Sequence, residues 1–71
     1  MIRDVKKRKQ LENLVYERYG IFLTPEDKIP LQREVGAILE GYELCVRDVV
    51  KWIGEGSSSE VLLSRFQHLI F

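Results

Sequence analysis

The sequence LQREVGAILEGYELCVRDVVKWIGEG, residues 31–56, is rich in apolar residues and decides the predicted fold of this chain. Thirteen of the 23 residues from 31 to 53 are apolar. A heptad seam runs through them in steps of four and three, at Leu31, Val35, Ile38, Tyr42, Cys45, Val49 and Trp52. This spacing is typical of a helix that packs along one side. We therefore predict one long helix over residues 31–53.

A second apolar row lies beside this seam and widens the apolar face of the predicted helix. Its members are Leu39, Val46, Val50 and Ile53. The two rows together span roughly 160°, whereas one buried helix face needs a stripe of about 100°. Each large side chain left in water forfeits about 1.5–3 kcal/mol of burial energy. Because two long helices related by a two-fold axis would recover that energy, we expect a homodimer that pairs through the long helix.

Two glycines, Gly36 and Gly41, lie inside the predicted long helix. Each costs a helix about 1 kcal/mol relative to alanine. They are either tolerated at this cost, or they let the backbone of another helix come close.

Helix-start and helix-stop residues place a shorter helix on each side of the long one. Asp4 can cap the start of a helix over residues 4–19, and Gly20 can end it. Serines 57–59 can cap a last helix over residues 59–70.

The segment between the first two helices reads IFLTPEDKIP, residues 21–30. Thr24 before Pro25, with Asp27 three residues after Thr24, is typical of a helix start. Pro30 disfavours a helix interior, so we expect a single helical turn at residues 25–28 and a new helix from Pro30. The apolar residues 21–23 are expected to pack across the end of the bundle.

These elements predict an all-α fold, with residues 1–71 forming a single α-helical domain. We expect a small three-helix bundle in the order short, long, short. One extra helical turn lies between the first and second helices, and the bundle is expected to be dimeric through the long helix.

Composition excludes several classes of protein. Eleven Lys and Arg residues balance eleven Asp and Glu residues, whereas a nucleic-acid-binding domain of this size usually has a basic excess. Cys45 is the only cysteine and His68 the only histidine, which excludes an internal disulfide and a Cys/His zinc site within one chain. We expect no metal and no cofactor.

The sequence also bears on location. No segment approaches the roughly 18 consecutive apolar residues that a membrane span needs. No apolar stretch follows the basic start of the chain to form a signal peptide. An unpaired cysteine on an apolar helix face fits a reducing compartment. We therefore expect a cytoplasmic protein that does not bind a membrane.

Residues with catalytic chemistry are few and dispersed. Cys45 lies in the apolar seam, where a structural thiol is ordinary. The segment GEGSSSE, residues 54–60, lacks the lysine and the preceding strand of a phosphate-binding loop. The acids of the long segment are scattered around its helix: Glu34, Glu40, Glu43 and Asp48. We therefore predict that the protein is not an enzyme.

Trp52 is the residue that most indicates binding. A tryptophan at the edge of an apolar arc is either half-buried core or an interface anchor. Leu44 lies on the opposite face of the same helix, which indicates a second contact surface. The predicted interface residues are Leu39, Leu44, Val46, Val50, Trp52 and Ile53. Our first hypothesis is a small regulatory protein, a homodimeric adaptor or inhibitor that binds a larger protein.

The alternative hypothesis is a dimeric nucleic-acid-binding regulator. Its possible phosphate contacts are Arg3, Lys6, Lys7, Arg8 and Lys9. Four consecutive helical residues point in four directions, so a solvated face is the other reading of the run at 6–9. Cations near a helix N-terminus also oppose the helix dipole, and an acidic partner or fraying of the first turn would relieve this conflict. Steep weakening of binding with salt would favour the nucleic-acid alternative.

Overall fold

The computed structural model describes residues 3–69 of the chain, and all regular secondary structure in these residues is helical. Four α-helices follow one another, and the first and last of them continue into irregular helical turns. The elements are α1 (Val5–Asn13), the π-helical segment η1 (Leu14–Tyr19), α2 (Pro25–Ile38), α3 (Glu43–Gly54), α4 (Ser59–Phe66) and the 3₁₀ turn η2 (Gln67–Leu69).

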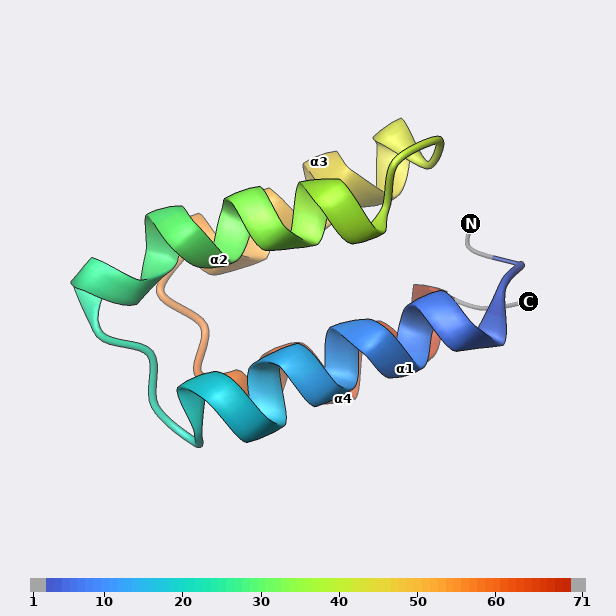
Figure 1. The fold of residues 1–71 in the computed structure, drawn as a ribbon. Coiled ribbons are helices and arrows are strands. Elements are labelled where there is room, and N and C mark those ends of the chain that lie inside the picture. The colour runs from blue at the N-terminus through green and yellow to red at the C-terminus, as the bar shows by residue number, and fades with distance from the viewer. Residues whose placement is uncertain (1–2, 70–71) are drawn as a thin grey trace.

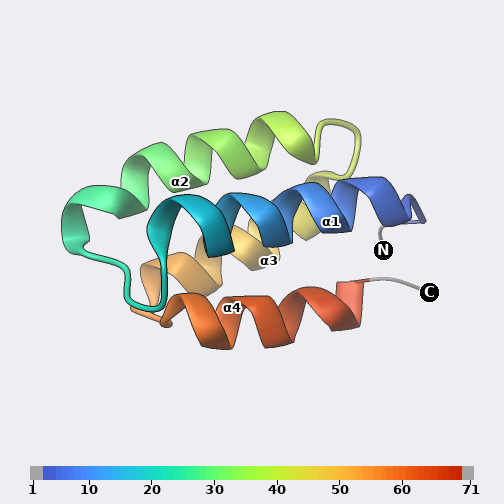
Figure 2. The same ribbon diagram turned by 60° about the horizontal axis from the view of Figure 1, so that its bottom comes forward.

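The four helices form an up-and-down bundle in two layers (Figures 1 and 2). α1 and α4 lie in one layer, and α2 and α3 lie in the other. Successive helices run antiparallel, so the α2–α3 connection lies at the end of the bundle where α1 begins. The prediction of an all-α fold is confirmed for the described residues.

The predicted long helix does not exist, so the three-helix arrangement was wrong in this detail. α2 ends at Ile38 and α3 begins at Glu43. Between them the Tyr42 N–H donates to the Leu39 carbonyl oxygen at 2.8 Å, and Gly41 has a φ of +94°. This is the third position of a tight turn, where a positive φ favours glycine. A straight helix over residues 31–53 would be about 34 Å long, whereas the backbone of the described residues extends 29 Å along its longest axis.

Folding back at this turn explains the wide apolar arc. The turn divides both apolar rows, so α2 and α3 each carry part of the arc, and the two parts share one core inside the chain. The fully or almost fully buried apolar side chains are Leu11, Val15, Leu31, Val35, Leu39, Cys45, Val49, Ile53, Leu62, Phe66 and Leu69. The seam that predicted a dimer is therefore used largely in the core of the chain itself.

The first helix follows its sequence signals closely. The Asp4 side chain accepts a hydrogen bond from the Lys6 N–H at 2.9 Å, as expected of an N-cap. The helix then continues through η1 and stops at Gly20, whose φ is +70°. The predicted boundaries of this helix are confirmed, while its last turns are π-helical instead of α-helical.

The second helix starts where Thr24 predicted but does not break at Pro30. The Thr24 N–H and hydroxyl donate to the Asp27 carboxylate at 3.3 and 2.7 Å. Pro30 lies in the second turn of α2. Because proline has no N–H, the carbonyl oxygen of Glu26, four residues earlier, has no helical donor. Both residues are exposed. Because water can reach this carbonyl oxygen, one missing bond does not end the helix.

The last helix and the first loop depart from expectation in smaller ways. α4 is capped by Ser58, whose side chain accepts from the Val61 N–H at 3.3 Å. Ile70, the last position predicted for this helix, lies outside the described residues. In the loop, Leu23 packs against the core, but Ile21 and Phe22 do not close the end of the bundle. Within residues 3–69, no helix combines the length and apolar character of a membrane span.

Candidate protein-binding groove between α1 and α4

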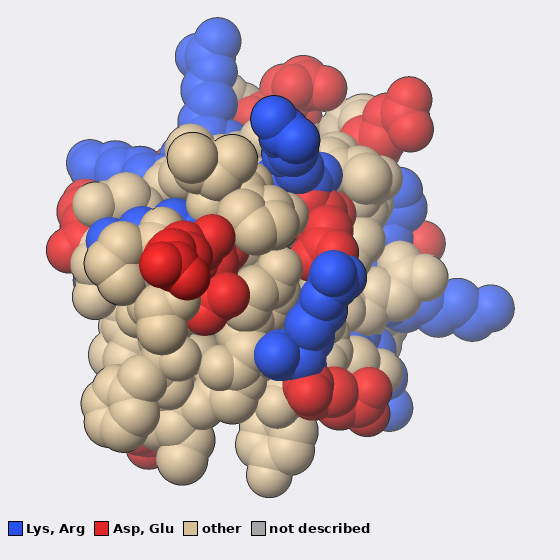
Figure 3. Space-filling view, turned by 60° about the vertical axis from the view of Figure 1, so that its left-hand side comes forward, with Lys and Arg blue, Asp and Glu red and all other residues tan. Residues whose placement is uncertain are grey.

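Three large apolar side chains lie exposed at one corner of the bundle. Tyr16 on η1 is 72% exposed, and Ile21 and Phe22 in the following loop are 61% and 78% exposed. The loop is fixed in place because the Ser59 N–H at the start of α4 donates to the Ile21 carbonyl oxygen at 3.0 Å. Figure 3 views the end of the molecule that carries this loop, and the lower left part of that surface is largely uncharged. Exposed apolar patches of this kind mark interaction sites in small proteins.

Tyr16 and Ile21 line a groove between the first and last helices, which we call the α1/α4 groove, and Phe22 follows Ile21 in the loop. It consists of two adjoining hollows that share Tyr16 and Leu63 as lining residues. The complete lining is Glu12, Asn13, Tyr16, Gly20, Ile21, Glu60, Leu63 and Gln67. Tyr16 and Leu63 therefore form the apolar centre of the groove, with Ile21 and Glu60 towards one end and Glu12 and Gln67 towards the other.

A π-helical segment shapes one wall of this groove. η1 covers six residues, from Leu14 to Tyr19, and includes the groove residue Tyr16. π-helical turns are rare and are found frequently at functional sites. The irregular turn lets Val15 enter the core while Tyr16 faces solvent and Tyr19 reaches the opposite layer of the bundle.

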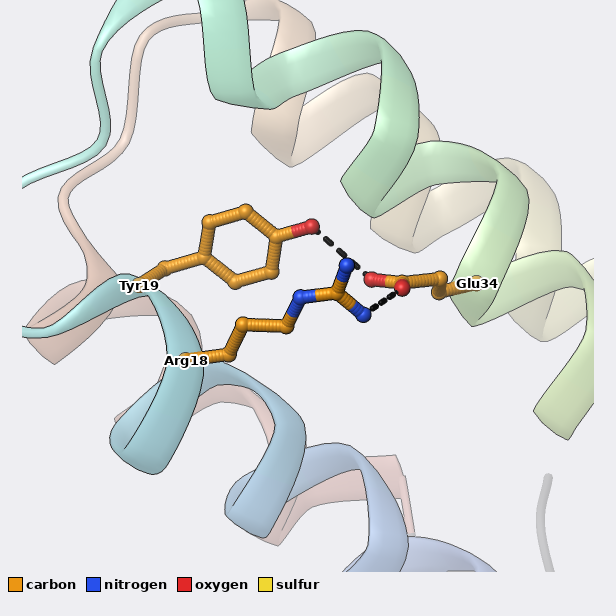
Figure 4. A network of polar contacts seen from close by, with 3 residues as sticks. All are labelled: Arg18, Tyr19 and Glu34. Carbon is orange, nitrogen blue, oxygen red and sulfur yellow. Dashed lines mark hydrogen bonds and ion pairs between the residues drawn. The ribbon is translucent and has the colours of Figure 1, made fainter.

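Tyr19 and its neighbour Arg18 join η1 to α2. The Tyr19 hydroxyl donates to Glu34 Oε2 at 2.8 Å, and Arg18 forms an ion pair with the other oxygen of the same carboxylate (Figure 4). Burial of the phenol, together with its hydrogen bond to Glu34, raises the pKa of Tyr19 to about 12. The network is a structural link between the two layers, and it directs Arg18 away from the groove.

The charged side chains that line the groove are both acidic. Glu12 and Glu60 are the charged residues among the described residues of the lining. The Arg8 Nε atom lies 3.9 Å from Glu12, a long contact between partly exposed groups. Arg65 on α4 lies over the Trp52 ring, 5.3 Å from its centroid, and so belongs to the α3 side. The groove therefore presents carboxylates beside an apolar centre.

The predicted interface residues do not form one surface. Leu39 and Ile53 are fully buried in the core and offer no surface to a partner. Val46 and Val50 are half-buried, and Val46 packs against the core. Leu44 is 72% exposed, as predicted from its place behind the apolar arc.

Trp52 is half-buried and packs against the core, which agrees with the first of the two readings that the sequence left open. Leu44, Asp48 and Trp52 recur at every fourth position along α3 and line a second hollow. The other lining residues of that hollow are Cys45, His68 and Leu69. This α3 face is a second apolar surface, separate from the α1/α4 groove.

The basic residues of the first helix do not act as one patch. Lys7 Nζ donates to the Glu40 carbonyl oxygen at 3.4 Å and lies 5.5 Å from the Tyr42 ring centroid. Arg8 is directed along its own helix towards Glu12. The remaining members of the predicted set, Arg3, Lys6 and Lys9, are exposed.

The described part of the chain shows no arrangement that could hold a metal ion. No three of its His, Cys, Asp and Glu side chains come close enough together for that purpose. Cys45 is 4% exposed, as expected of a structural thiol in the core.

Sequence reasoning missed Tyr16, Ile21 and Phe22 as surface residues. One signal was available, because Ile21 and Phe22 follow the helix-ending Gly20 and have no helix face on which to lie.

Comparison with protein-family models, with curated proteins and with solved structures finds no significant match for this chain.

Proposed function

We propose that this chain is a small, non-enzymatic protein-interaction module that binds a larger protein through the α1/α4 groove. The observation that supports this most is the exposure of Tyr16, Ile21 and Phe22 at one corner, beside a groove that Leu63 also lines. Aromatic side chains in such positions are typical anchors of protein interfaces. Covering them with a partner would recover burial energy that the isolated chain does not obtain.

An adaptor or an inhibitor is the role that fits this proposal. The bundle supplies a rigid base, because four helices share one core. The long-helix seam no longer supports pairing of two copies, since its residues face the core of their own chain. We therefore propose that the module meets its target as a single chain.

The nucleic-acid alternative receives less support. Of its five basic residues, Lys7 and Arg8 contact other groups of the chain. Arg3, Lys6 and Lys9 remain for phosphate contacts, and the net charge of the chain is zero. Binding that weakens steeply with salt would favour this alternative.

The proposal is tested by capture of partners from the native cell extract with tagged wild-type and variant chains. Tyr16→Ser and Phe22→Ser remove apolar groups from the exposed corner without emptying the core. Leu44→Ser is the matched control, because Leu44 is as exposed as Tyr16, at 72%, but lies on the α3 face. Circular dichroism confirms that each variant remains folded.

The proposal predicts that a protein captured by the wild type is lost with Tyr16→Ser and Phe22→Ser and kept with Leu44→Ser. The reverse pattern, loss with Leu44→Ser or Trp52→Ala alone, would assign binding to the α3 face. Capture that disappears as salt is raised and when Lys6 and Lys9 are replaced by alanine would support the nucleic-acid alternative.

A further inference from the structure

We infer that the occupant of the α1/α4 groove is a cationic amphipathic helix of the partner protein. This inference rests on the proposed function and adds the chemical class of the bound segment. It combines the shape of the groove with the sign of the charges along it.

The shape of the groove favours a helix of two or three turns. Its α4 wall runs from Glu60 to Gln67, which is about 10 Å of helix axis. α1 and α4 run antiparallel along the two walls (Figure 2). A helix bound in such a groove presents apolar side chains at positions i, i+4 and i+7. An extended peptide has less to pair with, because the described residues contain no strand edge.

The charges favour a cationic occupant. Glu12 lies towards one end of the groove and Glu60 towards the other, and both carboxylates border apolar lining residues. Arg8 pairs with Glu12 at a long distance of 3.9 Å between partly exposed groups, and Glu60 has no ion-pair partner among the described residues. Arg18 and Arg65 are engaged on other faces of the bundle, with Glu34 and the Trp52 ring. Because the chain has a net charge of zero, attraction of a cationic helix would come from this local arrangement and not from the whole protein.

Two synthetic peptides of 14 residues test this inference with the full-length chain. Both peptides carry leucines at the same i, i+4 and i+7 positions. One has lysines on the flanks of the leucine stripe, and the other has glutamates. Titration of each peptide into the ¹⁵N-labelled chain gives a Kd and identifies the backbone amides that shift.

We expect the lysine peptide to shift amides of residues 12–23 and 59–67 and to bind roughly three- to tenfold more tightly than the glutamate peptide. Glu12→Gln together with Glu60→Gln is expected to abolish this preference. Glu43→Gln together with Glu55→Gln is the matched control, because both residues are exposed and neither lines the groove. This control has the same change in net charge and is expected to keep the preference.

The outcomes separate this inference from the proposed function. Equal binding of both peptides in the groove, or tighter binding of the glutamate peptide, would overturn the cationic occupant and leave the groove as a binding surface. Shifts confined to α3, or no shifts with either peptide, would contradict both. Groove amides that shift with protein concentration alone would show that a second copy is the occupant, which would also overturn the inference.

Discussion

Replacement of Gly41 by alanine tests whether the chain folds back between α2 and α3. Gly41 has a φ of +94°, and a Cβ atom built at this position meets nothing within 4 Å. The cost of Gly41→Ala therefore comes from the backbone alone. A left-handed conformation costs an L-residue about 1–2 kcal/mol, while loss of glycine freedom in the unfolded chain returns about 0.4–1 kcal/mol. We expect a net loss of about 1 kcal/mol in the free energy of unfolding.

Gly36→Ala is the matched control for this substitution. Gly36 lies within α2, its φ is not positive, and a Cβ atom there also meets nothing within 4 Å. Alanine should therefore stabilise the protein by about 0.5–1 kcal/mol through helix propensity. Since 1 kcal/mol corresponds to about 4–8 °C in a domain of this size, the Tm values of the two variants should differ by about 10 °C.

Thermal and urea unfolding, followed by circular dichroism at 222 nm, measure both changes. Gly41→Asn adds a further control, because asparagine tolerates positive φ better than alanine and should lose less stability. If residues 31–53 formed one continuous helix, both glycines would be helix-interior positions and both alanine variants would be stabilised. Stabilisation by Gly41→Ala would therefore refute the fold-back turn.

Three other predictions follow from the same structure. The pKa of Tyr19 is raised to about 12 from 10, so the Tyr19 hydroxyl stabilises the folded state fully below pH 10. This stabilisation is lost as pH rises through 12. Urea unfolding between pH 9 and 12 should therefore show a steeper loss of stability for the wild type than for Tyr19→Phe. Ser58→Ala should lower the free energy of unfolding by about 1 kcal/mol through loss of the α4 cap, and an equal loss with Ser57→Ala would argue against a specific cap. Sedimentation at micromolar concentration should give one species of 8.4 kDa, and a dimer unaffected by Leu44→Ser and Tyr16→Ser would restore the case for pairing through other surfaces.

Local signals in the sequence predicted helical starts at the beginning of α1, α2 and α4, whereas the start of α3 at Glu43 was not predicted. Asp4, Thr24 with Asp27, and Ser58 all act at helix starts as their side-chain chemistry suggests. These signals are reliable here because a cap depends on atoms only two or three residues away. The prediction of a helix break at Pro30 was wrong, because α2 runs through this residue. The cost of a missing N–H depends on whether water can reach the freed carbonyl oxygen.

The break between α2 and α3 could not be predicted from periodicity, because the apolar spacing continues through residues 39–42. What decides the break is the burial gained when Leu31, Val35 and Leu39 meet the apolar face of α3, and this is a tertiary effect. Gly41 was noted in the sequence, but it was interpreted either as a tolerated helix residue or as a site where another backbone comes close. A turn at this glycine was not considered. The wide apolar arc was noted in the sequence, but it was attributed to pairing of two chains. In the structure, two helices of one chain carry this arc.

The candidate groove was also beyond local reasoning. Tyr16 occupies an apolar position of the first helix, and its exposure follows only from the placement of α4 beside η1. By contrast, Leu44 was predicted to be exposed and is exposed, because it lies directly opposite the apolar face of its own helix. Exposure could thus be predicted from one helix alone, but not where it depends on how two helices meet.

Hydrogen–deuterium exchange of the chain, free and bound to the protein it captures, tests most directly whether the α1/α4 groove is the binding surface. If the partner binds in the groove, amide exchange should slow on binding in residues 12–23 and at the start and middle of α4. The exchange rates of α3 should stay unchanged. Protection confined to residues 43–54, or to the basic turns at residues 3–9, would contradict the assignment of binding to this groove.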